Sequence, residues 1–202
     1  MPILEVAHDI ICPWCWVGRI QAKKLRNEFP GLSFIWKGYE LLPAGMEYNP
    51  PAPDPNAPVK PRTPSRFELL LAADGLVLPE RLSYRSVSRM ALEGAEYALE
   101  VGRQEEYLDG VYNIYWEEDR DISDPGVLAK VAEDAGLNVD EFMDALKSRK
   151  YKDSVVEYDE PAHAAGIWNV PTWKFPAEWV AEQPYTVLRE MMQQFIKDSS
   201  NG

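Results

Sequence analysis

Cys12 and Cys15 are the only cysteines among the 202 residues, and two residues separate them in the stretch DIICPWCWVGR (9–19). Two thiols with this spacing at the start of a helix can close a disulfide without displacement of the backbone. The same thiols could instead ligate a metal ion, or pack in the core as small apolar side chains. The surrounding sequence has to decide between redox chemistry, metal binding and a purely structural role.

The cysteine pair stands where a predicted strand meets a predicted helix. Residues 3–11 (ILEVAHDII) are rich in aliphatic side chains, which is typical of a strand covered on both faces. Pro13 suits the first helical position, because its missing N–H would have no partner there. Small and apolar residues then recur at helical spacing from Cys15 onward, and a second strand is predicted over 32–40. The opening is therefore strand–helix–strand, with Cys12 at the start of the helix.

These positions predict different roles for the two thiols. A sulfur at the start of a helix faces free backbone N–H groups and the positive end of the helix dipole, which stabilise a thiolate. Cys12 is therefore predicted to be the exposed nucleophile. Cys15 heads the apolar stripe one turn later and is predicted to be shielded and to resolve a mixed disulfide. Asp9 is a candidate proton acceptor for Cys15, the alternative being an ordinary solvated residue at a strand end.

A metal site is the main alternative for the cysteine pair. A structural zinc site takes four ligands, and this chain offers only His8 and His163 in addition to the cysteines. A Cys2His2 set is not excluded by the count alone. A Cys-X-X-Cys motif at a strand-to-helix junction is itself a redox signature, so we predict redox chemistry and no metal.

The rest of the chain divides into three parts. Residues 49–65 are dense in proline and are predicted to form a connector. Residues 66–165 show helical periodicity throughout, and no strand is predicted within them. Short segments rich in β-formers follow at 170–175 and 178–182, and Pro184 precedes a last predicted helix.

Strands together with a helix are predicted at both ends of the chain. The economical interpretation is one discontinuous α/β domain, formed by residues 1–48 and 166–202 and interrupted by a helical insertion over 66–165.

Composition limits the classes of partner. The formal net charge is -12, with 27% charged and 46% hydrophobic residues. An acidic surface repels phosphate backbones and anionic lipids, so neither nucleic acid nor a membrane is an expected partner. The N-terminal segment has no basic region, and Glu5 interrupts its apolar residues, so a signal peptide is not predicted and the cytoplasm is the expected compartment.

The strand–CPWC–helix opening resembles the thioredoxin superfamily, and within it the DsbA-like branch with a helical insertion. The chain is most similar to the FrnE-like group of disulfide oxidoreductases, which is related to 2-hydroxychromene-2-carboxylate isomerases and kappa-class glutathione transferases. The stretches that carry the resemblance include GLVLPERLSYRSVSRMALEGAEYALEVG, IYWEEDRDISDPGVLAKVAEDAGL, AHAAGIWNVPTWKF and AEQPYTVL. The resemblance implies an α/β protein with a thioredoxin fold and a large all-helical insertion.

The resemblance also implies which residues support the cysteines. Pro171 takes the place of the family's cis-proline, which faces the cysteine pair, and Val170 then exposes its backbone to an extended substrate. Pro13 and Trp14, between the cysteines, are expected to support the site or to contact substrate. Trp168 and Trp173 flank this second motif, as candidates for a substrate groove or as core aromatics.

Three functions are compatible with these residues. The leading prediction is a thiol–disulfide oxidoreductase that cycles Cys12–Cys15 on protein or peptide thiols without an organic cofactor. The first alternative is a glutathione-dependent isomerase or transferase, although those relatives typically carry serine in place of Cys12. The second is a non-catalytic module that binds a ligand in the groove beside Pro171. The resemblance adds glutathione as a candidate partner and favours a homodimer.

Overall fold

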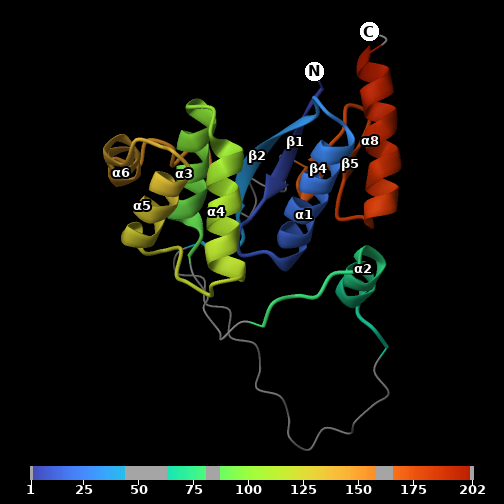
Figure 1. The fold of residues 1–202 in the computed structure, drawn as a ribbon, viewed down its shortest axis with the longest axis horizontal. Helices are drawn as coiled ribbons and strands as arrows, with labels where there is room; N and C mark the ends of the chain where they lie inside the picture. The colour runs from blue at the N-terminus through green and yellow to red at the C-terminus, as the bar shows by residue number, and fades with distance from the viewer. Residues whose placement is uncertain (1, 44–62, 81–86, 158–165, 201–202) are drawn as a thin grey trace, which may run out of the picture.

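The computed structural model describes residues 2–43, 63–80, 87–157 and 166–200. A five-stranded sheet runs through the molecule in the order β3-β2-β1-β4-β5 (Figure 1). β1 pairs in parallel with β2 and antiparallel with β4, so that Val6 lies between Trp36 and Trp173. The strands are β1 (Ile3–His8), β2 (Ser33–Glu40), β3 (Val156–Glu157), β4 (Thr172–Lys174) and β5 (Trp179–Val180).

The helices gather in two places. Helices α3 to α6 form a bundle beside β2, whereas α1 and α8 lie together on the β4–β5 side, with α2 close to them (Figure 1). The helices are α1 (Pro13–Glu28), α2 (Arg66–Asp74), α3 (Arg89–Glu100), α4 (Gln104–Trp116), α5 (Pro125–Asp134), α6 (Val139–Lys147) and α8 (Tyr185–Ser200). This arrangement confirms the predicted α/β class, the thioredoxin fold and the helical insertion. The predicted connector lies largely outside the described residues.

One predicted feature of the insertion is wrong. The segment 66–165 contains β3, which pairs in parallel with the end of β2 through Tyr39 and Val156. A strand of two residues is too short to show a period in the sequence, and only its pairing with β2 creates it. The insertion therefore contributes backbone to the sheet itself.

At Trp36, α4 completes a part of the β2 edge that none of the described strands covers. The Gln104 side chain accepts a hydrogen bond from Trp36 N at 2.9 Å and donates one to Trp36 O at 2.8 Å. A single side-chain amide thus satisfies both backbone groups of a buried residue, as a neighbouring strand would. This contact fixes the start of α4 relative to the sheet.

The bundle packs so closely that α3 needs a residue without a side chain at Gly94. A Cβ atom at this position would overlap the Tyr107 hydroxyl on α4 and lie 2.9 Å from two ring atoms of Phe142 on α6. Both aromatic side chains are fully buried and cannot move aside. Gly94→Ala is therefore expected to lower the free energy of unfolding by about 1–3 kcal/mol, because overpacking outweighs the better helix propensity of alanine.

Chemical denaturation measures this effect, and Gly126→Ala on α5 is the control. Apart from its chain neighbours and the backbone of its own helix, a Cβ atom at Gly126 would have one atom within 4 Å, the Oδ1 atom of Asp124 at 3.2 Å. Equal stability of the Gly94→Ala variant and the unsubstituted protein would contradict the proposed close packing.

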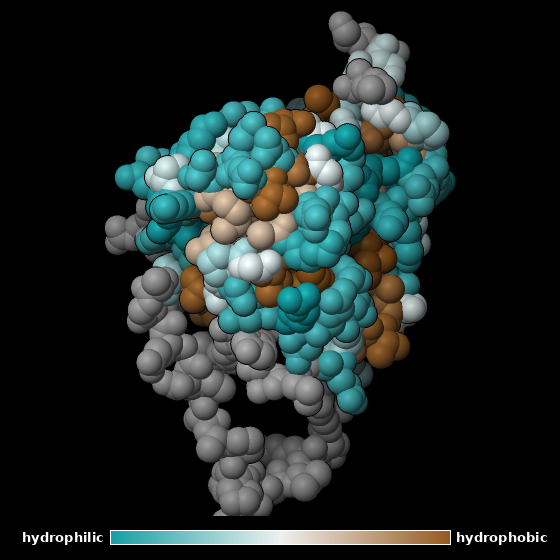
Figure 2. Space-filling view, turned by 60° about the vertical axis from the view of Figure 1, so that its left-hand side comes forward, coloured by the Kyte–Doolittle hydropathy of each residue, from teal (hydrophilic) through white to brown (hydrophobic). Residues whose placement is uncertain are grey.

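Figure 2, which brings the bundle side forward, shows a mostly hydrophilic face with scattered apolar areas. Among the described residues, no helix is long and apolar enough to cross a membrane.

Candidate active site

The first turn of α1 positions both cysteines. Cys12 occupies the N-cap with extended backbone angles (φ -81°, ψ 120°), Pro13 begins the helix, and the Cys12 carbonyl accepts the Trp16 N–H at 3.0 Å. Cys15 follows on the face of α1 that is turned into the core and is fully buried. Both cysteines are free thiols in this structure.

Cys12 is not exposed, contrary to the prediction. Only 4% of the residue is accessible, and its Sγ atom donates a hydrogen bond to Val170 O at 3.4 Å. The loop that leads into β4 packs directly on the start of α1 and covers the thiol. The Val170–Pro171 peptide bond in this loop is cis. The structure thus brings together Cys12, Cys15, Val170 and Pro171 from distant parts of the chain.

Gly18 makes this close approach possible. A Cβ atom on Gly18 would lie 3.3 Å from Pro171 Cγ and 3.6 Å from the Trp173 ring. α1 therefore passes under Pro171 with no side chain between them. In the sequence Gly18 is indistinguishable from the other small residues of the core stripe, and only the position of Pro171 gives it a role.

The Asp9 residue is fully buried in the turn that precedes Cys12. Burial raises the pKa of Asp9 to about 6, although hydrogen bonds from the N–H groups of Leu41 (2.7 Å) and Ile11 (3.3 Å) oppose this shift. Burial, followed by the contact with the Cys12 sulfur, raises the pKa of the Cys15 thiol well above its ordinary value. Cys15 is therefore a thiol that needs a proton acceptor before it can attack. A hydrogen bond between the Cys15 sulfur and the Asp9 backbone lowers the Cys15 pKa, and the charge of the Asp9 carboxylate raises it.

Helix α4 holds the turn that precedes Cys12. The Tyr112 hydroxyl donates to the Asp9 carbonyl at 3.1 Å and is 2.9 Å from His8 Nδ1, and Trp116 Nε1 donates to the Ile10 carbonyl at 2.8 Å. No role was predicted for Tyr112 from the sequence. Two aromatic side chains with hydrogen-bonding groups, four residues apart on one helix face, were the available signal for this role.

Trp14 is only partly buried and faces α2. Its ring lies 4.8 Å from that of Phe67, edge to face. Asp74 at the other end of α2 accepts hydrogen bonds from Gln21 Nε2 (2.6 Å) and Tyr185 N (2.8 Å). A cavity of about 210 Å³ remains beside Trp14, between α2 and residues 182–184. The helix thus forms one wall of the surroundings of the CPWC motif.

The remaining candidate residues, two tryptophans and two histidines, do not form one site. Trp173 is fully buried, so it is a core aromatic and does not line a substrate groove. Trp168 is 66% exposed. His8 is also fully buried, and burial together with the positive charge of Arg19 lowers its pKa to about 3. His163 lies outside the described residues. Within the described part of the chain, no three His, Cys, Asp or Glu side chains are grouped to hold a metal ion.

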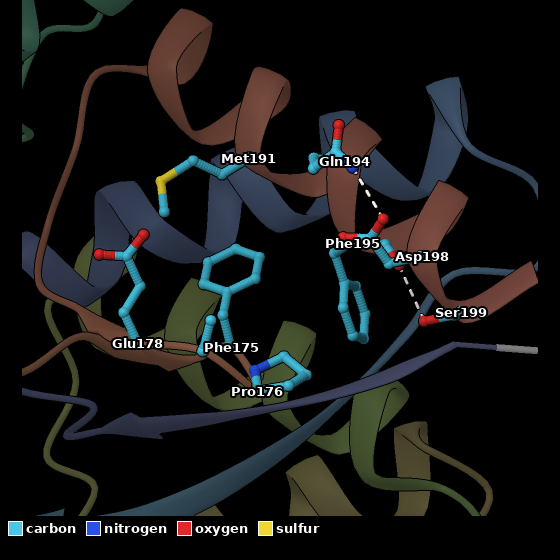
Figure 3. A pocket seen from close by; sticks show the side chains of 9 residues that line it. Phe175, Pro176, Glu178, Met191, Gln194, Phe195, Asp198 and Ser199 are labelled. Carbon is cyan, nitrogen blue, oxygen red and sulfur yellow. Dashed lines mark hydrogen bonds between the residues drawn. The ribbon is translucent and has the colours of Figure 1, made fainter. Parts of the chain in front are cut away.

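A second, apolar cavity lies away from these residues. It has a volume of about 490 Å³ between α8 and the β4–β5 segment, and Figure 3 shows Met191 and Phe195 of α8 facing Phe175 and Pro176 across it. None of the predicted site residues lines this cavity.

Comparisons with known proteins identify the family of the chain. Residues 3–183 match the family described as DSBA-like thioredoxin domain. A curated relative, the uncharacterized protein YwbO of Bacillus subtilis (strain 168), is 29% identical over 179 residues, which cover 84% of each chain.

Solved structures show the same fold at low sequence identity. A probable DsbA oxidoreductase from Streptomyces coelicolor has a TM-score of 0.68 and 24% identity, covering 96% of this chain and 90% of its own. The cytosolic disulfide reductase DsbM from Pseudomonas aeruginosa with GSH has a TM-score of 0.64 and 16% identity, with 97% and 100% covered. A 2-hydroxychromene-2-carboxylate isomerase has a TM-score of 0.66 and 17% identity, with 99% and 98% covered.

The family match spans the cysteine motif, the insertion and the Val170–Pro171 loop. The structural neighbours include a DsbA-like oxidoreductase and a 2-hydroxychromene-2-carboxylate isomerase, two of the three kinds of protein that the resemblance named. The chain belongs to the DSBA-like thioredoxin domain family.

Proposed function

We propose that the protein is a thiol–disulfide oxidoreductase of the FrnE-like kind, acting on protein or peptide thiols through Cys12 and Cys15. The observation that carries the proposal is the position of Cys12, at the N-cap of α1 with its sulfur 3.4 Å from Val170 O. In the proposal, a substrate segment displaces the Cys12 thiol from Val170 O and pairs with this backbone beside the reactive sulfur.

In the proposed cycle Cys12 attacks the substrate and Cys15 resolves the mixed disulfide. The Cys12 thiolate attacks a substrate disulfide, and one substrate sulfur leaves as a thiolate. Cys15 loses its proton to Asp9 and attacks the Cys12 sulfur, which releases the second substrate sulfur and closes the Cys12–Cys15 disulfide. The substrate gains two electrons and the dithiol loses them. The reverse sequence oxidises a substrate dithiol.

The surroundings of Cys12 favour particular partners. Trp14, the cavity beside it and the Val170 backbone offer apolar and hydrogen-bonding surfaces to a peptide next to its cysteine. Glutathione is a second candidate substrate. The proposed setting is the cytoplasm, with the protein as a homodimer and without an organic cofactor.

The test is the equilibrium of the Cys12–Cys15 pair against a glutathione redox series, followed by thiol alkylation. A midpoint near about -270 mV would assign a reductase, and one between about -180 and -120 mV a donor of disulfides. If no intramolecular disulfide forms at any ratio, the proposal fails. Glutathione-conjugating or isomerising activity in the Cys15→Ser variant would instead favour the transferase alternative.

A further inference from the structure

The apolar cavity between α8 and the β4–β5 segment has no part in the proposed function. Its volume of about 490 Å³ lies within the range of sites that hold small organic molecules, about 300–1,000 Å³. Phe175, Pro176 and Ala177 form one wall, and Met191 and Phe195 of α8 form the other (Figure 3). Mostly apolar walls with a few polar groups are typical of a small-molecule site.

The spacing of apolar residues along α8 explains why its wall of the cavity is apolar. Leu188 and Met192 lie one turn apart, are fully buried and hold the helix against the core. Met191 and Phe195 repeat this spacing on the neighbouring face and are only partly buried. The apolar stripe of α8 is therefore wider than the core beneath it, and its uncovered part lines the cavity.

Two aromatic rings meet in the wall of the cavity. The ring centroids of Phe175 and Phe195 are 5.9 Å apart, and the ring planes stand at 83° in an edge-to-face pair. Rings at right angles turn two aromatic faces toward one corner, and the face of an aromatic ring attracts a cation. Phe175 is buried and directly follows β4, so the sheet holds this part of the wall in place.

The charged residues that line the cavity are both acidic. They are Glu178 and Asp198, which Figure 3 shows toward opposite ends of the cavity. Asp198 accepts a hydrogen bond from Gln194 Nε2 at 2.7 Å, whereas no ion pair or hydrogen bond joins Glu178 to another residue that the structure describes. Among the described lining residues none is a lysine or an arginine. The charge complement of this rim is a cation, and the net charge of -12 favours the same sign of ligand.

We propose that this cavity binds a small amphipathic organic cation, in which an aryl or alkyl body carries one amine or quaternary ammonium group. The apolar body lies between Phe175, Met191 and Phe195, and the cationic group lies beside the Glu178 carboxylate. Binding involves no covalent step. The site is separate from the cysteines, so the proposal does not depend on the proposed function.

Phenylbutylamine, phenylbutanol and phenylbutyrate test the proposal, because they share one apolar body and differ in charge at neutral pH. The methyl groups of the methionines are labelled in the full chain, and NMR titration follows the Met191 signal, which Met191→Leu identifies by its loss. The amine should shift this signal and bind about fivefold more tightly than the alcohol, which is the size of effect expected for one exposed ion pair. The butyrate should bind more weakly than the alcohol.

Glu178→Gln tests the charge, and Glu190→Gln is its matched control, because Glu190 is an exposed acid of α8 outside the lining of the cavity. In Glu178→Gln the amine should bind no better than the alcohol, whose own affinity should not change. Glu190→Gln should keep the preference of the unsubstituted protein. Ala177→Phe, at an exposed position of the wall, should fill the cavity and abolish binding of all three probes.

Several outcomes would overturn the proposal. One is an alcohol or butyrate that binds as tightly as the amine, and another is a preference for the amine that persists in Glu178→Gln. A Met191 signal that none of the probes shifts would show that the cavity is closed to small molecules. A signal that changes when the protein alone is diluted would instead assign this face to an interface between two copies of the chain.

Discussion

Cys12→Ser is expected to abolish turnover of disulfide substrates, by at least about three orders of magnitude, because a serine hydroxyl stays protonated and cannot replace the thiolate nucleophile. Cys15→Ser should behave differently. Cys12 can still attack, but nothing resolves the product, so substrate should remain bound through a Cys12 mixed disulfide. Intact mass spectrometry after addition of a peptide disulfide measures both results.

The two variants are controls for each other, because Cys12 and Cys15 are the only cysteines of the chain and each variant keeps one of them. The assignment requires a stoichiometric adduct on Cys15→Ser and none on Cys12→Ser. An adduct on Cys12→Ser alone would reverse the assigned roles. Comparable adducts on both would show that burial of Cys15 does not protect it from substrate.

Asp9→Asn is expected to stabilise the fold while it slows resolution of the mixed disulfide. The pKa of Asp9 is about 6 in the folded protein, against an ordinary value of 3.8. Between these values the folded state binds more protons than the unfolded chain, so the free energy of unfolding falls as pH rises through this interval and stays lowered above it. A difference of about two pH units corresponds to about 3 kcal/mol, which is the upper limit of the gain at pH 8.

Urea denaturation at pH 4 and pH 8 measures this prediction. The variant should be more stable than the unsubstituted protein at pH 8, and the gain should largely disappear at pH 4, where Asp9 is mostly protonated in the folded state. Asp144→Asn, at an exposed position on α6, is the control and should show no such gain at pH 8. A loss of stability at pH 8 would mean that the hydrogen bonds to Asp9 outweigh the cost of burying its charge.

The sequence predicted those parts of the site that depend on residues close together in the chain. A strand that runs into Cys-Pro, followed by small residues at helical spacing, was enough to place Cys12 at a helix start and Cys15 in the core. The sequence could not predict the burial of Cys12, because the loop that covers it is 158 residues away. Long-range packing, here made possible by Gly18 under Pro171, decides the exposure of a side chain at a helix end.

The surroundings of Asp9 show the same limit. Its partners come from the end of β2, the start of α3 and the middle of α4. In the sequence, Tyr112 looked like an ordinary core residue. Only the packing of the insertion against the sheet reveals that Tyr112 orders the turn before Cys12 and that Ser88 lies beside Asp9.

The outer strands of the sheet have a consequence for self-association. β3, as far as the structure describes it, and β5 comprise two residues each. Gln104 occupies the backbone groups of Trp36 that β3 leaves uncovered. Long, flat edge strands offer rows of unpaired backbone groups to a second chain and promote aggregation. The short β3 and β5, and the Gln104 side chain that pairs with Trp36 in place of a strand, leave few unpaired backbone groups at the edges of the sheet. A second molecule therefore finds little exposed backbone to which it could add a strand.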